Sequence, residues 1–135
     1  MTFSPREDLD ELVDFLLSFA EEQLRAHGEF HPFAGKINAR GDVVPVAMDM
    51  GDDGLPDASA VIDELAAALR ADPDVRATGI CFDVSLEDGS DAARVDLEHR
   101  DAEPLAVCLP YSRKRLRGLQ FGEIFAAPGP VRVFA

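Results

Sequence analysis

The sequence has no apolar run that approaches the roughly 18 residues that a membrane-spanning helix needs. Its first residues, MTFSPREDLDEL, are acidic and polar, whereas a secretory signal peptide would be basic and then apolar. Both absences predict a cytoplasmic protein that does not insert into a membrane. The 135 residues also contain no low-complexity tract and no repeat of solenoid period, so we expect a single domain over residues 1–135.

Cysteine is scarce, and the common catalytic signatures are missing. Cys81 and Cys108 both have apolar neighbours, and the cytoplasm keeps such thiols reduced, so both are expected in the core. Neither has a recognisable catalytic context, and no serine lies in a Gly-x-Ser-x-Gly elbow. Glycine-rich nucleotide-binding loops are absent too. We therefore expect no cofactor, and the chain does not resemble an enzyme of these classes.

Basic residues are few, with 13 Lys and Arg against 26 Asp and Glu and a net charge of −13. Residues 1–103 carry a net charge of −17, whereas residues 104–135 carry +4. The acidic bulk argues against a nucleic-acid partner, because the phosphate backbone would be repelled.

The basic end of the chain concentrates its charge in one short segment between two expected strands: Arg113, Lys114, Arg115 and Arg117. One interpretation is a solvated hairpin loop. The other is a contact surface for an acidic partner, which includes a second copy of the same protein.

Helical signals mark two segments. Ser4 can cap a helix that has Pro5 in its first position and Glu7 at the end of a capping box. Gly28 is expected to close that helix, since glycine adopts the left-handed conformation easily. Its buried stripe is expected at helical spacing: Leu9, Leu12, Val13, Leu16, Ala20 and Leu24. A second helix should be capped by Asp57 or Ser59 and continue through Arg70.

The remaining apolar residues follow a period of two, which is typical of strands. Strands are expected over residues 30–38, 43–48, 80–86, 95–99, 105–111 and 119–125. The order α-β-β-α-β-β-β-β predicts an α+β fold, with two helices packed on one face of an antiparallel sheet. One core is expected under both helices, formed by Phe30, Phe33, Ile80, Phe82, Val95, Leu97, Val107, Leu109 and Phe121.

Four short motifs resemble a family of small uncharacterised bacterial proteins. They span nearly the whole chain: GEFHPF at 28–33, LEHRD at 97–101, LPY at 109–111 and FGE at 121–123. The resemblance implies no activity. The element order is also similar to roadblock and profilin-like domains, which are interaction modules, although a fourth late strand and the lack of a final helix depart from that pattern.

Potential metal ligands cluster at His27, Glu29 and His31. The zincin pattern needs two histidines on a continuous helix, and a glycine and a proline interrupt this one. In an extended chain, alternate residues share a face and the three side chains would align. The competing interpretation places His27 at a helix end and the neighbouring phenylalanines in the core. We favour the structural interpretation and keep the three residues as weak metal candidates.

His99 lies on the apolar face of an expected strand, beside Val95 and Leu97. It could act as a general base oriented by a carboxylate. The alternative is a buried ring whose hydrogen bonds are satisfied, which is the commoner situation on such a face.

The acidic loop at residues 49–54 is similar to a calcium-binding loop, but two positions that should supply a calcium ligand hold residues whose side chains cannot bind the ion. Gly51 occupies the third ligand position, and Ala60 stands where a bidentate glutamate belongs. A solvated loop that leads into a helix is the favoured interpretation.

The leading hypothesis is a non-enzymatic, cytoplasmic protein-interaction domain with no membrane or nucleic-acid partner. The first alternative is a small metal-binding protein or enzyme that uses His27, Glu29 and His31, or His99. The second is a sensor domain that binds a small anion at the basic segment. No residue is assigned a catalytic role.

Overall fold

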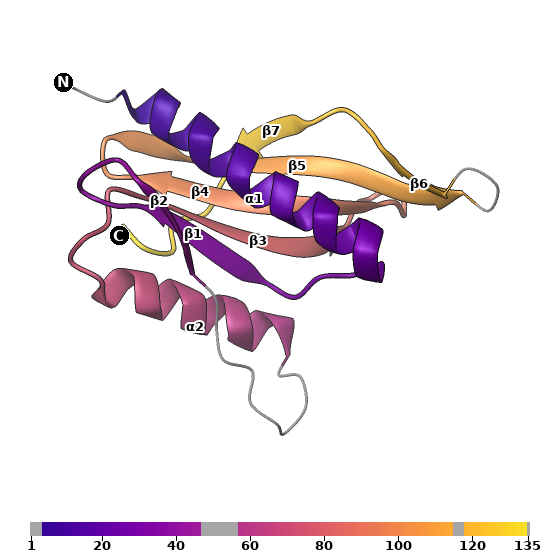
Figure 1. Cartoon of the computed structure of the whole chain (residues 1–135), viewed down its shortest axis with the longest axis horizontal. Helices are drawn as coiled ribbons and strands as arrows, with labels where there is room; N and C mark the ends of the chain where they lie inside the picture. The colour runs from indigo at the N-terminus through magenta and orange to yellow at the C-terminus, as the bar shows by residue number, and fades with distance from the viewer. Residues whose placement is uncertain (1–3, 47–56, 115–117, 135) are drawn as a thin grey trace.

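The structure, a computed structural model, describes residues 4–46, 57–114 and 118–134, with only the backbone of residues 113 and 114. Within these ranges the chain forms two helices and seven strands (Figure 1). They are α1 (Pro5–His27), β1 (Phe33–Ile37), β2 (Val43–Val46), α2 (Ala58–Ala71), β3 (Ala77–Ser85), β4 (Asp91–His99), β5 (Ala102–Lys114), β6 (Gly118–Phe121) and β7 (Phe125–Pro128).

The strands form one antiparallel sheet in the order β2-β1-β3-β4-β5-β6. The long strand β5 pairs with two short strands, because β6 lies opposite Tyr111–Lys114 and β7 lies opposite Leu105–Cys108. The expected α+β class is confirmed, and so is the order of the two helices and the first six strands. The last expected strand, 119–125, is in fact two strands with a break after Phe121.

Helix α1 begins and ends where its local signals predict. The Ser4 hydroxyl accepts a hydrogen bond from the Glu7 backbone N–H at 3.1 Å, and Pro5 is the first helical residue. At the other end Gly28 has φ of 77°, and its N–H donates to the Leu24 carbonyl at 2.9 Å. The expected buried stripe is confirmed, since its leucines and Ala20 are buried and Val13 is half-buried.

The two helices pack on opposite faces of the sheet. The core under α1 includes Cys81 and Val95, whereas α2 packs with Ala34 and Ile80. Successive residues of a strand point to opposite faces, so the neighbours Ile80 and Cys81 belong to different cores. The expectation that both helices cover one face is therefore wrong. Every residue of β3 from 77 to 81 is buried, and a strand that is buried on both faces lacks the polar alternation that would reveal its second face.

The single core expected from the sequence is divided in the same way. On the α1 face lie Phe30, Phe33, Val95, Leu97, Val107, Leu109 and Phe121, whereas Ile80 and Phe82 lie on the α2 face. Val133, near the end of the chain, also joins the α2 core. The C-terminal tail therefore helps to cover the face that α2 leaves open.

Helix α1 lies across one face of the sheet (Figure 1). Two glycines of the sheet face this helix, and their lack of side chains lets it lie close. Gly35 and Gly79 are partners in the β1–β3 register. A Cβ atom on Gly79 would lie 2.5 Å from Leu16 Cδ1, which is too short for real atoms. The absence of a side chain at Gly79 therefore makes room for Leu16.

Candidate functional site

The three weak metal candidates, His27, Glu29 and His31, are all exposed. His27 is the last residue of α1, so the extended arrangement that would align the three side chains is not present. Across the part of the chain that the structure describes, no group of three or more His, Cys, Asp or Glu side chains is placed to hold a metal ion.

Both cysteines are buried, as expected. Burial raises the pKa of the Cys81 thiol and of the Cys108 thiol above the ordinary value of 9.0. The thiolate is the nucleophilic form of cysteine, and it is therefore suppressed at both positions near neutral pH. The geometry gives neither thiol the character of a reactive group.

His99 belongs to a buried charged cluster beneath the first turns of α1. Its Nε2 atom lies 2.8 Å from Asp8 Oδ2, and both side chains are 2% exposed. Arg76 donates from Nε and Nη2 to the two carboxylate oxygens of Asp8, each at 2.8 Å. Burial raises the pKa of Asp8, but the hydrogen bonds from Arg76 and His99 outweigh it and hold that pKa below its ordinary value. Asp8 is therefore an ionised group that joins α1 to the sheet.

The second ring nitrogen of His99 is also occupied. Nδ1 accepts a hydrogen bond from the Asp101 backbone N–H at 3.0 Å, so in the neutral ring Nε2 carries the proton and donates to Asp8. A general base needs a nitrogen within reach of a substrate proton, and both nitrogens of His99 have protein partners. The structure supports the interpretation of His99 as a buried, hydrogen-bonded ring.

Two charged segments that stand out in the sequence lie partly or wholly outside the described residues. In the basic segment, β5 includes the backbone of Arg113 and Lys114, which pair with Leu119 and Gly118 as a hairpin would require. The side chains of the predicted partner surface, Arg113, Lys114, Arg115 and Arg117, are not described, so that surface stays a prediction. The acidic loop at 49–54 also lies outside the described ranges.

Two phenylalanines of α1 are exposed, Phe15 at 36% and Phe19 at 40%. They are four residues apart, so they are neighbours on one side of the helix. The Phe19 ring packs edge to face on Phe33 with 4.8 Å between centroids, and Phe33 packs on Phe30 in the same way at 5.9 Å. The exposed pair therefore continues a row of aromatic rings that leads into the α1 core.

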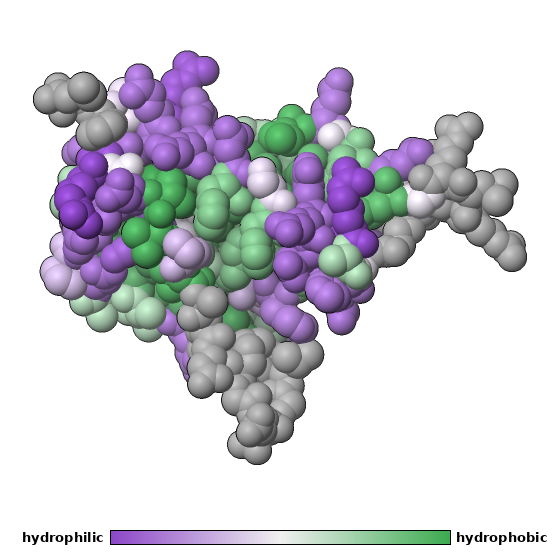
Figure 2. Space-filling model, in the orientation of Figure 1, coloured by the Kyte–Doolittle hydropathy of each residue, from purple (hydrophilic) through white to green (hydrophobic). Residues whose placement is uncertain are grey.

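Polar residues of the same helix surround this pair. Asp14, Phe15, Ser18, Phe19 and Glu22 line a shallow groove, which we call the aromatic groove of α1. Figure 2 shows apolar patches that interrupt the hydrophilic surface on this side of the molecule. No sequence motif marks Phe15 and Phe19, although their spacing in the helix is a signal. Both fall outside the buried stripe, so a regular helix has to direct them away from the core.

The C-terminal tail is held on the α2 face by Glu98 of β4. The buried Glu98 carboxylate accepts hydrogen bonds from the backbone N–H groups of Arg132, Val133 and Phe134, at 2.9 to 3.2 Å. The Arg132 side chain adds a hydrogen bond from Nε to Asp96 Oδ2 at 3.1 Å. One carboxylate thus fixes three consecutive residues of the tail.

Glu98→Gln should loosen the tail. All three tail N–H groups reach Oε1, but the Val133 N–H also donates to Oε2 at 2.9 Å. An amide NH2 group in the place of Oε2 cannot accept that hydrogen bond and would set two donors against each other, at a cost of about 1–3 kcal/mol in unfolding free energy. Hydrogen exchange should also quicken at the Val133 amide. The exposed Glu103→Gln is the matched control and should change neither quantity. Unaltered protection of Val133 in Glu98→Gln would show that its hydrogen bond to Oε2 does not hold the tail.

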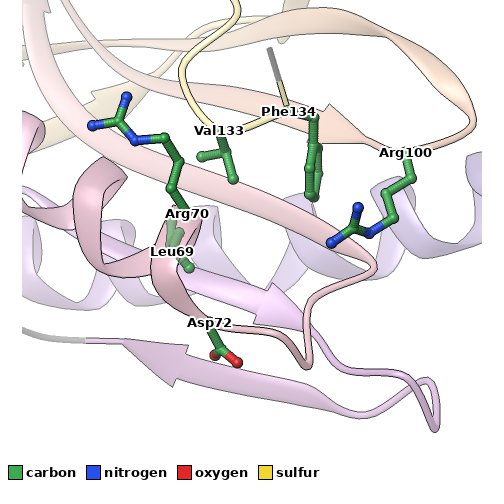
Figure 3. A pocket seen from close by; sticks show the side chains of 6 residues that line it. All are labelled: Leu69, Arg70, Asp72, Arg100, Val133 and Phe134. Atoms are coloured by element: carbon green, nitrogen blue, oxygen red, sulfur yellow. The ribbon is translucent and has the colours of Figure 1, made fainter.

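The tail, the end of α2 and the β4–β5 turn enclose a pocket of about 300 Å³ (Figure 3). Arg100 donates from Nε to the Val75 carbonyl at 2.8 Å, and its guanidinium carbon lies 4.7 Å from the centroid of the Phe134 ring. Arg70 donates from Nη1 to the Arg132 carbonyl at 3.1 Å. The lining residues are Leu69, Arg70, Asp72, Arg100, Val133 and Phe134. No motif could have revealed this pocket, because its walls come from three separate segments.

Comparison with known proteins adds no homologue. The chain matches no family model, no curated protein and no solved structure. The resemblance to a small bacterial family therefore stays a prediction. Within the described residues, no helix is long and apolar enough to cross a membrane.

Proposed function

We propose that this chain is a non-enzymatic, cytoplasmic protein-interaction domain that binds a basic amphipathic segment of another protein through the aromatic groove of α1. The observation that carries the proposal is the exposure of Phe15 and Phe19 side by side on a helix whose exposed charged residues are mostly acidic.

The two rings supply the apolar part of the contact. Single exposed apolar residues are common on protein surfaces, but adjacent aromatic rings are enriched where proteins bind one another. Removing the remaining exposed area of each ring from water would contribute on the order of 1–2 kcal/mol. Because Phe19 already packs on Phe33, its ring loses little freedom on binding.

The charges around the rings select the partner. Glu11 lies one turn before Phe15, Asp14 lies beside it, and Glu22 lies about one turn after Phe19; all three carboxylates are exposed. A second copy docked on this surface about a two-fold axis would bring like charges together, which is unfavourable. A cationic segment with an apolar side would satisfy both the rings and the carboxylates.

The basic segment formed by Arg113, Lys114, Arg115 and Arg117 is a separate proposed contact for an acidic partner. Its charge is opposite to that of the aromatic groove, so the two surfaces would bind different chemistry. Sedimentation of the chain at low and high salt tests whether the basic segment promotes self-association, because screening weakens contacts between exposed charges.

The groove can be tested with a labelled amphipathic helical peptide of leucine and lysine, followed by fluorescence anisotropy. We expect Phe15→Ser/Phe19→Ser to weaken binding by about tenfold or more, because buried aromatic anchors dominate such contacts. Ile124→Ser/Val131→Ser is the matched control, since it removes two apolar side chains that are 57% and 53% exposed elsewhere. This control should bind within about twofold of wild type, as expected for residues outside the contact.

A peptide with glutamate in place of lysine should bind much more weakly to the wild-type protein. Equal affinity for the two peptides, or equal losses in both double variants, would overturn the proposed groove. Self-association of the wild type that disappears in Phe15→Ser/Phe19→Ser would assign the groove to a second copy, and would likewise overturn the proposed partner.

A further inference from the structure

Two arginines beside the pocket of Figure 3 have no carboxylate partner among the described residues. Arg76 pairs with Asp8, and Arg94 and Arg132 pair with Asp96. Among the described residues, Arg70 and Arg100 each donate to a backbone carbonyl and neither pairs with a carboxylate. Two positively charged groups without acidic partners therefore lie at one pocket of a chain that has 26 acidic and 13 basic residues.

Arg100 is exposed, and two contacts orient its guanidinium group. Its Nε–H is used by the Val75 carbonyl, and the guanidinium plane is supported by the ring of Phe134. Both Nη groups have no partner among the described residues. A planar guanidinium that is already positioned can donate two parallel hydrogen bonds to a carboxylate at a small entropic cost.

The remaining charges at the pocket do not oppose an anion. Among the described residues, Asp72 is the one acidic residue of the lining, and Lys36 pairs with its carboxylate. The hydrogen bonds from Lys36 and from the Asp74 backbone lower the pKa of Asp72, so the group is an anion already matched by a cation. The negative end of the α2 dipole also lies here, and Arg70 in the last helical turn offsets it.

We propose that this pocket binds a small carboxylate with a short apolar body. The carboxylate would lie on the Nη groups of Arg100, with Arg70 contributing positive charge at the rim. The apolar body would pack against Leu69, Val133 and Phe134, which Figure 3 shows between and beside the two arginines. A volume of about 300 Å³ suits a ligand of this size. This site is independent of the aromatic groove of α1.

Sodium benzoate is a suitable probe, followed by backbone amide NMR spectra of the whole protein. We expect saturable shifts at Arg100, Val133 and Phe134 that are absent with benzyl alcohol, which lacks the charge, and weaker with inorganic phosphate, which lacks the apolar body. Arg100→Gln should weaken benzoate binding by about tenfold or more, because it removes a charged hydrogen-bonding partner. Arg40→Gln, at an exposed arginine of the β1–β2 turn, is the matched control and should bind as the wild type does.

Arg100→Lys keeps the charge but loses the planar fork, so an intermediate affinity would support two-point binding. The wild-type titration does not depend on any variant folding. Absence of benzoate shifts at the pocket would overturn the proposal, as would equal binding of benzyl alcohol or an unchanged affinity in folded Arg100→Gln. Failure here would leave the peptide experiment on α1 unaffected.

Discussion

Asp8→Ala should lower the free energy of unfolding by about 3–5 kcal/mol, because it leaves a half-buried arginine and a buried histidine without their shared carboxylate. Asp8 and His99 are each 2% exposed, and Arg76 makes two hydrogen bonds to Asp8. Urea-induced unfolding near neutral pH would measure the loss. Asp10→Ala, two residues along the same helix and exposed, is the matched control and should change stability by less than about 0.5 kcal/mol.

A double-mutant cycle separates two effects of Asp8→Ala: the loss of the Asp8–Arg76 ion pair, and the cost of leaving the Arg76 charge without its carboxylate partner. If Arg76 is the group left uncompensated, Asp8→Ala/Arg76→Met should be less destabilised than the sum of the two single variants. Additive losses would contradict a direct charge interaction between Asp8 and Arg76.

The Asp8 carboxylate should also make the free energy of unfolding depend on pH. Burial raises the pKa of Asp8, but the hydrogen bonds from Arg76 and His99 bring it below the ordinary value of 3.8. Because the pKa of Asp8 is lower in the folded state than in the unfolded state, the ionised carboxylate stabilises the fold at pH values above 3.8. This contribution is lost as the pH falls through the folded-state pKa. The stability gap between wild type and Asp8→Ala should therefore be full near neutral pH and narrow below pH 3.8. If the difference in stability between wild type and Asp8→Ala stayed constant on acidification, Asp8 would not be the ionised, stabilising group that we assign.

Leu16→Ala should cost about 2–5 kcal/mol, because Leu16 is fully buried between α1 and the sheet. Its contact with Gly79 allows a sharper test than truncation alone. Gly79→Ala in the wild type should destabilise the fold by about 1–3 kcal/mol, since the new Cβ would meet Leu16 Cδ1 at 2.5 Å. In the Leu16→Ala background the same methyl group should fill part of the cavity and be neutral or stabilising.

Gly35→Ala provides a graded control, because its Cβ would lie 3.2 Å from Leu12 Cδ1 and so needs a smaller adjustment. We expect a smaller loss than for Gly79→Ala. If Gly79→Ala cost the same in both backgrounds, the close approach of α1 to β3 at this point would be refuted.

Local signals in the sequence were sufficient for the helix ends and for most of the strands. The Ser4 cap and the left-handed Gly28 act within one turn of the chain, so the bounds of α1 could be predicted without knowledge of its neighbours. The hairpins of the late strands also depend on nearby residues, and their order is confirmed. The division of the last strand at Phe121 was missed, because pairing with different parts of β5, rather than a change of period, separates β6 from β7.

The sequence by itself determined the α+β class, the order of the elements and the buried stripe of α1, because spacing along the chain encodes these features. Only the tertiary structure decided which face each helix covers, because β3 is buried on both sides. It also decided that His99 meets Asp8 and that Glu98 holds the tail, across separations of 91 and up to 36 residues. Such contacts depend on how distant segments pack, and no local pattern of residue types specifies them.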